Sequence, residues 1–315
     1  MTAKIINQGR QWIAHGDNVI TLPRNQGNIN FRSICTIHLP SMGGVTNRGP
    51  AHTRPMTITT KVDTVNRLLV RLHGGFGFTS GGNVGAVSAV TERFDDVANN
   101  QTIRTNLTTA RYDLAGYSLN GFGFTSGGFI AAVTDVTERF DDVANTHTNR
   151  TGLNTARSVS AGYSLNGFGF TSGGNTGVPS GATERFDDVA NNHTGRTALN
   201  TARNELAGYS LNGFGFTSGG AGPSNIVERF DDVANTHTNR TALNTARAAL
   251  ACYSLNGFGF TSGGSDAGFA ISSVTERFDD VANNHTNRTA LNTARFGPTG
   301  YSTNEYFINF ITANQ

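Results

Sequence analysis

The stretch GFGFTSGG occupies residues 75–82 and returns at residues 121–128, 167–174, 213–220 and 257–264. Successive copies therefore begin 46, 46, 46 and 44 residues apart. Each copy leads through a short variable stretch into a second repeated phrase, ERFDDVAN, and each unit closes on an arginine. A period in the mid-forties indicates one supersecondary unit that is copied and placed beside itself. Such a repeat favours a modular scaffold over an enzyme with a single catalytic centre.

Each repeat reads as four short antiparallel strands. In the second repeat, Asn120-Gly121 is a strong hairpin signal, because both central residues of a type I′ turn need positive φ. Asp141 to Asn145 supplies a second turn. The strands predicted around these turns cover residues 116–119, 122–126, 136–140 and 147–153. Four strands per unit, with no helical periodicity, predict an all-β propeller in which each repeat forms one blade.

The repeat resembles the kelch family in several spacings. In that family a strand ends in Gly-Gly, an aromatic residue and Asp follow, and an Arg closes the unit. The matching residues here are Gly81, Gly82, Phe94, Arg111, Gly127, Gly128, Phe140, Arg157, Gly173, Gly174, Phe186, Arg203, Gly219, Gly220, Phe230, Arg247, Gly263, Gly264, Phe278 and Arg295. One position departs from the family, because its Trp is replaced by Gln101, His147, His193, His237 and His285. The resemblance covers residues 68–311 and implies a kelch-like propeller.

The chain ends suggest how the ring closes. Full repeats are assigned to residues 68–111, 112–157, 158–203, 204–247 and 248–295. Residues 296–315 offer two strands of a further blade, and residues 55–67 offer its remaining part. Joining them would remove two exposed strand edges. We therefore expect six four-stranded blades within a propeller spanning residues 51–315, with seven blades as the alternative if residues 20–50 form another.

Residues 1–50 carry no repeat and are expected to form an anchor or a brace. Residues 4–20 suggest a short helix followed by a turn at Gly16. Ile6 precedes the pattern Asn-x-Gly-Arg, an opening that resembles the start of some phage tail and fibre proteins. We also expect two free thiols at Cys35 and Cys252, because these cysteines stand far apart in dissimilar contexts.

The charge and composition of the chain disfavour some classes of binding partner. The net charge is only +2, so no large field favours nucleic acid or an anionic membrane. No apolar run approaches the roughly 18 residues of a membrane-spanning helix, and no secretion signal opens the chain. Within the repeats every basic side chain except histidine is arginine, whose fork suits pairing with the ERFDD carboxylates.

The repeated histidines and aspartates could in principle bind metal. Equivalent residues in different blades are related by rotation and stand apart, so the histidines are expected not to share a metal ion. Of each Asp-Asp pair, one is expected to cap the turn and the other to pair with Arg. We therefore expect neither metal nor cofactor, and no catalytic residue.

The copies differ mainly in two connections, which a four-stranded antiparallel blade places on one face. These are the loops after Gly-Gly and the segments between blades, and loops on a rigid scaffold often carry recognition. The alternative is unconstrained drift. The candidate binding residues are Asn83, Val84, Phe129, Ile130, Asp135, Asn175, Thr176, Ser224, Asn225, Ser265, Asp266 and Phe269. The opposite face is uniform and could dock on a symmetric neighbour.

These features favour a non-enzymatic binding or assembly protein, located in a bacteriophage virion as a tail, fibre or decoration component. Its partner would be another virion protein or a host-surface glycan or protein, and it would act as a homo-oligomer or within a larger assembly. The alternative is a cytoplasmic kelch adaptor that binds a protein. A glycan-active enzyme is less favoured, because acidic residues recur evenly by blade instead of clustering.

Overall fold

The computed structural model describes residues 4–8, 11–15, 57–62, 68–73, 76–95, 98–298, 300 and 307–310, and side chains from residue 76 to residue 300. Every regular element among these residues is a β-strand, so the protein is all-β in the described part of the chain. No helix there has the length and apolarity to cross a membrane. The chain forms two compact units, one of residues 76–302 and one of residues 1–75 with 303–315.

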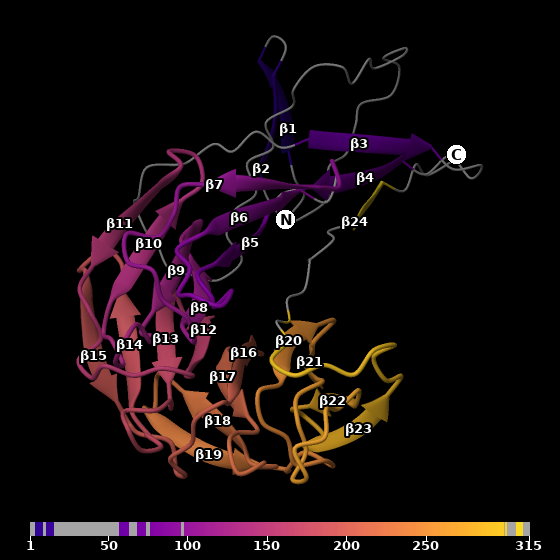
Figure 1. Ribbon diagram of the computed structural model, residues 1–315. Coiled ribbons are helices and arrows are strands. Elements are labelled where there is room, and N and C mark those ends of the chain that lie inside the picture. Colours follow the sequence, from indigo (N-terminus) through magenta and orange to yellow (C-terminus); the bar gives the residue numbers. More distant parts are fainter. Residues whose placement is uncertain are drawn as a thin grey trace. The chain divides into compact units, whose positions relative to one another are not determined.

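The larger unit is a β-propeller of five blades, which follow one another in chain order (Figure 1). Blade 1 has three strands, β5 (Gly77–Ser80), β6 (Thr91–Asp95) and β7 (Asn100–Arg104). The other blades have four strands each, in sequential antiparallel order. Blade 2 comprises β8 (Ala115–Leu119), β9 (Phe122–Ser126), β10 (Thr137–Asp141) and β11 (Thr146–Arg150). Blade 3 comprises β12 (Ala161–Leu165), β13 (Phe168–Ser172), β14 (Thr183–Asp187) and β15 (Asn192–Arg196). Blade 4 comprises β16 (Ala207–Leu211), β17 (Phe214–Ser218), β18 (Val227–Asp231) and β19 (Thr236–Arg240). Blade 5 comprises β20 (Ala251–Leu255), β21 (Phe258–Ser262), β22 (Thr275–Asp279) and β23 (Asn284–Arg288).

Local sequence explains each blade. The predicted hairpin turn is present, with φ of 52° at Asn120 and 84° at Gly121. The second turn is held by Asp141, whose Oδ1 accepts hydrogen bonds from the backbone N–H of Val143 and Ala144. Gly127 has φ of 67°, and a Cβ there would stand 2.4 Å from the Arg157 carbonyl oxygen, so only glycine fits.

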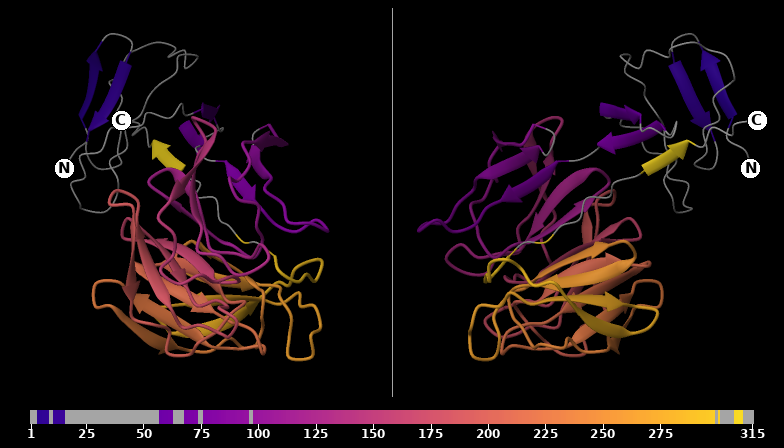
Figure 2. Two further views of the ribbon diagram at one scale, coloured as in Figure 1. Left: turned by 60° about the vertical axis from the view of Figure 1, so that its left-hand side comes forward. Right: turned by 90° about the vertical axis from the view of Figure 1, so that its right-hand side faces the viewer.

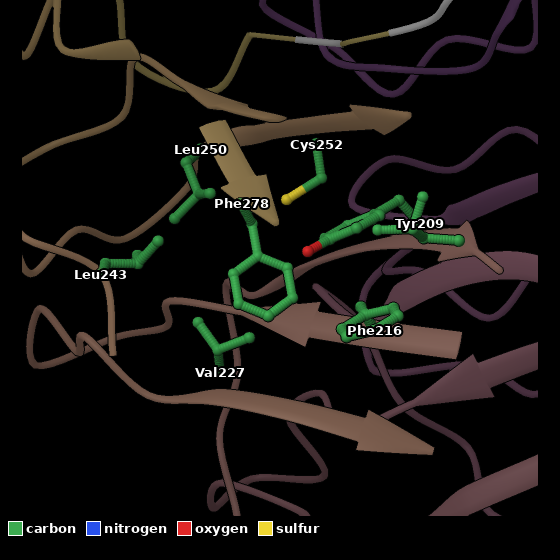
Figure 3. Packing of buried hydrophobic residues seen from close by; sticks show 8 residues of the cluster. Tyr209, Phe216, Val227, Leu243, Leu250, Cys252 and Phe278 are labelled. Atoms are coloured by element: carbon green, nitrogen blue, oxygen red, sulfur yellow. The ribbon is translucent and has the colours of Figure 1, made fainter. Parts of the chain in front are cut away.

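The apolar core lies between blades. Tyr209, Phe216 and Val227 of blade 4 pack with Cys252 and Phe278 of blade 5 in one buried cluster (Figure 3). The same arrangement joins blade 3 to blade 4, where Phe170 and Phe230 lie with ring centroids 5.5 Å apart. In blades 2 to 5 the phenylalanine of the ERFDD phrase is thus buried against the preceding blade, which makes blade stacking the main source of apolar burial.

The first strands of blades 2 to 5 (β8, β12, β16 and β20) run side by side along the inner edge of the sheets (Figures 1 and 2). Their contact is close because glycine occupies it: a Cβ on Gly162 would stand 2.6 Å from the Gly116 carbonyl oxygen. The Ser164 hydroxyl donates a hydrogen bond to the Ser118 carbonyl, and the Ser210 hydroxyl donates to the Ser164 carbonyl. The phrase Gly-Tyr-Ser therefore builds the inner contact between blades.

The expectation of six blades, with seven as the alternative, is wrong. Strand β4 (Leu68–His73), predicted to open the first repeat, instead pairs along its whole length with β3 (Thr57–Val62). On its other side β4 pairs with β24 (Phe307–Phe310), so strands from both chain ends share a three-stranded sheet, but in the smaller unit. Because β4 is used in this way, blade 1 keeps three strands.

The predicted helix within residues 4–20 is also wrong. Strands β1 (Lys4–Gln8) and β2 (Gln11–His15) form an antiparallel pair there. The β-branched and aromatic residues Ile5, Ile6, Trp12 and Ile13 favour strands. The suggested seventh blade, residues 20–50, and Cys35 lie outside the described residues, whereas Cys252 is a free, buried thiol as expected.

Candidate functional site on the variable face

Backbone pairing brings the two kinds of variable connection together. Tyr112, in the segment between blades 1 and 2, exchanges hydrogen bonds of 3.1 and 2.8 Å with Phe129 in the loop of blade 2. Ser158 and Asn175 pair in the same way one blade later, and Ala248 pairs with Ser265. We call the surface formed by the loops after Gly-Gly and the interblade segments the variable face, and the surface of the ERFDD-following turns the constant face.

Several predicted binding residues hold their loops in shape. Asn83 Oδ1 accepts a hydrogen bond of 2.9 Å from the Gly85 N–H, and Asp266 Oδ1 accepts bonds from the Gly268 and Ala270 N–H groups. Ser224 Oγ accepts from the Ile226 N–H. Ser265 is buried. Three further predicted binding residues are at least half-buried in their loops: Phe129, Asn175 and Thr176.

The loop tips expose apolar side chains. Val84 is 85% exposed, Ile130 41% and Phe269 82%. The prediction missed Val178, which is 66% exposed at the tip of the blade 3 loop, and Ile271 in the blade 5 loop. The sequence feature that could have identified these two residues is an aliphatic side chain within a loop of small residues such as Gly and Ala. The shorter blade 4 loop has no exposed large apolar residue among those described, although its Asn225 is exposed, as is Asp135 of blade 2.

A second feature of this face is a hydrogen-bonded row along the interblade segments. The Val159 N–H donates to the Asp113 carbonyl, Glu205 to Val159, and Ala249 to Glu205, at 2.8–3.0 Å. These four residues all have a positive φ, from 46° to 56°, which is rare for residues other than glycine and asparagine. The row fixes the spacing of the variable segments, and it places the carboxylates of Asp113 and Glu205 on this face. Sequence reasoning did not single them out.

The repeated aspartates serve the scaffold, as predicted. One Asp of each pair caps its own turn, as Asp141 does. In blades 2 to 5 the other pairs with arginines of the preceding blade: Asp188 lies 3.5 Å from Arg139 and 2.6 Å from Arg150. Arg139 also stacks over the Phe122 ring at 4.5 Å. These charges are therefore engaged between blades.

At each of the four junctions between blades, the closing arginine forms a buried ion pair with the ERFDD glutamate of the next blade. Arg111 pairs with Glu138, and neither side chain is exposed. Glu138 also accepts backbone hydrogen bonds from Thr108 and Thr109. Burial alone would raise the pKa of Glu138, but the bonds from Arg111 and Thr108 outweigh it and hold that pKa below its ordinary value. The glutamate is thus a fixed anion that ties one blade to the next.

The repeated histidines complete this interface. The His193 ring lies tilted against Phe186 with ring centroids 4.7 Å apart. Its Nε2 lies 3.3 Å from the Thr137 hydroxyl of the preceding blade, and its Nδ1 lies 3.7 Å from Glu184. Burial lowers the pKa of His193 to about 4, against the opposing effect of Glu184. The ring is therefore neutral at pH 7 and acts as a flat packing group.

Comparison with known proteins bears on the fold only. No protein-family model matches the chain, and no curated protein sequence matches it. Among similar solved structures is that of YjhT, with a TM-score of 0.57 and 12% sequence identity over 74% of this chain and 83% of YjhT. An identity this low shows that the two proteins have a similar fold and says nothing about activity. The larger unit of the chain is thus a five-bladed β-propeller with a constant scaffold and one variable face.

Proposed function

We propose that the protein is a non-enzymatic binding protein with kelch-type blades, whose variable face docks on a protein partner. The observation that carries this proposal is the placement of Val84, Ile130, Val178 and Phe269, one per blade, at the tips of four loops. These side chains stand on the loops that differ between copies, and loops on a structural scaffold often carry recognition. By contrast, the carboxylates of the ERFDD phrases are committed to turns and ion pairs within the scaffold.

The chemistry of the tips favours a protein over a glycan. Sugars bind through aromatic stacking and dense polar contacts, whereas three of the four tips are aliphatic. Val, Ile and Phe tips fit a partner with apolar pockets of its own, where a few anchors supply most of the affinity. Of the partners expected from the sequence, a virion or host protein therefore suits this face better than a host glycan.

The constant face offers a matched control. Val143, Val189, Val233 and Val281 project from equivalent turns there and are 80–90% exposed. The tip variant carries Val84→Ser, Ile130→Ser, Val178→Ser and Phe269→Ser, and the control carries Ser at the four constant-face valines. Both variants remove four exposed apolar side chains. Each substitution should therefore change the free energy of unfolding by no more than about 0.5 kcal/mol.

The setting we propose is a phage virion, supported by the N-terminal resemblance and the uniformity of the repeats. Labelled protein would be titrated onto host cells and onto purified particles, with antibody labelling of particles alongside. We expect binding that the tip variant weakens by about tenfold or more and the control leaves intact. An equal loss of binding in both variants would contradict the proposal that the variable face binds the partner. Unlabelled particles together with one stoichiometric partner from host lysate would instead favour the intracellular adaptor.

A further inference from the structure

The junction between blades 4 and 5 differs from the two junctions before it at the inner contact. Gly162 and Gly208 stand where the first strands of adjacent blades meet, and a Cβ on Gly162 would lie 2.6 Å from the Gly116 carbonyl oxygen. The equivalent position of blade 5 is Cys252, which pairs within its blade as those glycines do. Strands β16 and β20 therefore meet across a thiol side chain, whereas β12 meets β8, and β16 meets β12, across a glycine.

A hydrogen bond that closes the inner contact elsewhere is missing at this junction. The hydroxyl groups of Ser164 and Ser210 each donate to a serine carbonyl of the preceding blade. Ser254 holds the same position in blade 5, but among the described residues it forms no such bond. We attribute this loss to the Cys252 side chain, because it holds the two strands further apart than a glycine would.

A chain of hydrogen-bonding groups is also interrupted at this junction. At the junction of blades 2 and 3 its successive members, separated by 3.2, 3.2 and 3.3 Å, are Tyr117, Ser126, Thr137 and His193. In blade 4, Val227 takes the place of the threonine. Within the part of the chain that the structure describes, the Tyr209 hydroxyl, Ser218 Oγ and His285 Nε2 are consequently buried without a hydrogen-bond partner. Buried polar atoms without a partner destabilise the closed junction.

The ion pairs and ring contacts of the junction match those of its neighbour. Arg247 pairs with Glu276 at 3.0 Å, as Arg203 pairs with Glu228 at 3.0 Å. The phenylalanine rings that meet across it have centroids 5.6 Å apart, against 5.5 Å at the junction of blades 3 and 4. Valine has nearly the shape of threonine, so Val227 adds little packing to offset the unpaired atoms. Of the three junctions between four-stranded blades, this one is therefore the weakest.

Cys252 lies inside the closed junction. It is 7% exposed and belongs to one buried cluster with Tyr209 and Phe278, and the Tyr209 hydroxyl is turned toward it (Figure 3). Burial raises the pKa of the Cys252 thiol to about 12. A thiol in this state is not the nucleophilic thiolate at pH 7, and it becomes reactive only when water reaches it.

We propose that the junction of blades 4 and 5 opens locally while the junctions between blades 2, 3 and 4 stay closed, and that Cys252 is a modification site for small disulfides which this opening controls. Opening lets water bond to the three unpaired atoms, so it costs less free energy here than at the other two junctions. In the open state the Cys252 thiolate attacks one sulfur of the disulfide. A mixed disulfide forms, and the other half of the reagent leaves as a thiolate.

Thiol labelling under native conditions tests this proposal. The full chain carries Cys35→Ser, so that Cys252 alone reacts with dipyridyl disulfide, and the released pyridinethione is followed by its absorbance. We expect slow labelling whose rate hardly changes at low urea concentrations, because a local opening exposes little surface. Val227→Thr restores the missing hydroxyl and should slow the labelling about fivefold. Circular dichroism checks that each variant is folded.

The matched control is Thr183→Val, the reverse exchange at the junction of blades 3 and 4. It removes a hydroxyl 3.4 Å from His237 Nε2 and lowers the stability of the whole unit. If Cys252 reacts through local opening, this control changes its labelling rate by less than about twofold. A larger acceleration would mean that Cys252 reacts through global unfolding, and it would overturn the proposal. The proposal also fails if Val227→Thr leaves the rate unchanged, or if labelling begins only at urea concentrations that unfold the unit.

Discussion

At the scale of single residues, position 227 distinguishes blade 4 from its neighbours. Thr91 and Thr137 each lie within hydrogen-bonding distance of a serine on the adjacent strand and of a histidine on the next blade. Val227 occupies the equivalent position in blade 4. As a result, Ser218 Oγ and His285 Nε2 are both buried without a hydrogen-bond partner. Such unpaired groups cost free energy that a nearby hydroxyl would recover.

We therefore predict that Val227→Thr stabilises the protein, by about 1 kcal/mol in the free energy of unfolding. The two side chains have nearly the same shape, so packing against Phe278 is retained while two polar atoms gain a partner. Urea denaturation measures the change. The matched control is Thr183→Val, which removes the hydroxyl 3.4 Å from His237 Nε2 and should destabilise by about 1–3 kcal/mol. A destabilised Val227→Thr would contradict this account of the junction.

Packing at the junctions gives a second residue-scale prediction. Phe140 is 4% exposed and lies between Phe78 of blade 1 and its own blade's His147, at 5.3 and 4.7 Å. Phe140→Ala should lower the free energy of unfolding by about 3–5 kcal/mol, through lost burial and the cavity left behind. Val143→Ala, three residues away but 80% exposed, should change it by less than about 0.5 kcal/mol. A decrease below about 1 kcal/mol for Phe140→Ala would mean that Phe140 is not part of the apolar core.

At the scale of elements, the turn between β8 and β9 depends on its backbone conformation. Asn120 and Gly121 both have positive φ, and each β-branched residue placed there should cost about 1–3 kcal/mol. We predict that Val at both positions markedly lowers the thermal stability, whereas Asn120→Asp is tolerated because Asp also suits a type I′ turn. Melting curves followed by circular dichroism distinguish the two. Parent-like melting of the double-valine variant would be inconsistent with the observed turn.

Local patterns predicted these elements well, because their causes are local. The Asn-Gly turn, the Asp cap and the alternation in β9 and β10 follow from a few neighbouring residues. The partner of β4 could not be predicted in this way, because strand pairing depends on which distant strand is available. Leu68–His73 keeps the period of the repeat but lacks its Gly-Tyr-Ser phrase, which forms the inner contact elsewhere.

At the scale of the whole molecule, the number of blades depended on the chain ends, where the repeat stops. Each internal junction is specified by residues in both of its blades, such as Arg157 and Glu184, so the repeat predicts stacking but does not count blades. The variable face was predicted from where the copies differ, yet difference alone could not separate Asn175, which holds its loop, from Val178, which projects. That distinction depends on the loop's own hydrogen bonds.

The four junction histidines also make the stability of the whole propeller depend on pH. Burial lowers the pKa of His147, His193, His237 and His285 below the ordinary value of 6.5, to about 4 for His193. As pH falls below about 6.5, the unfolded chain binds protons that the folded chain does not, so stability is lost towards pH 4. The expected slope is about 1.4 kcal/mol per pH unit for His193, and the other three histidines add to it in the same direction. Denaturation between pH 7 and 4.5 measures it. His193→Gln introduces the residue that blade 1 carries at this position, and it should reduce the slope by the share of one histidine. A stability that does not change with pH in the parent protein would mean that these rings become charged in the folded protein as readily as in the unfolded chain.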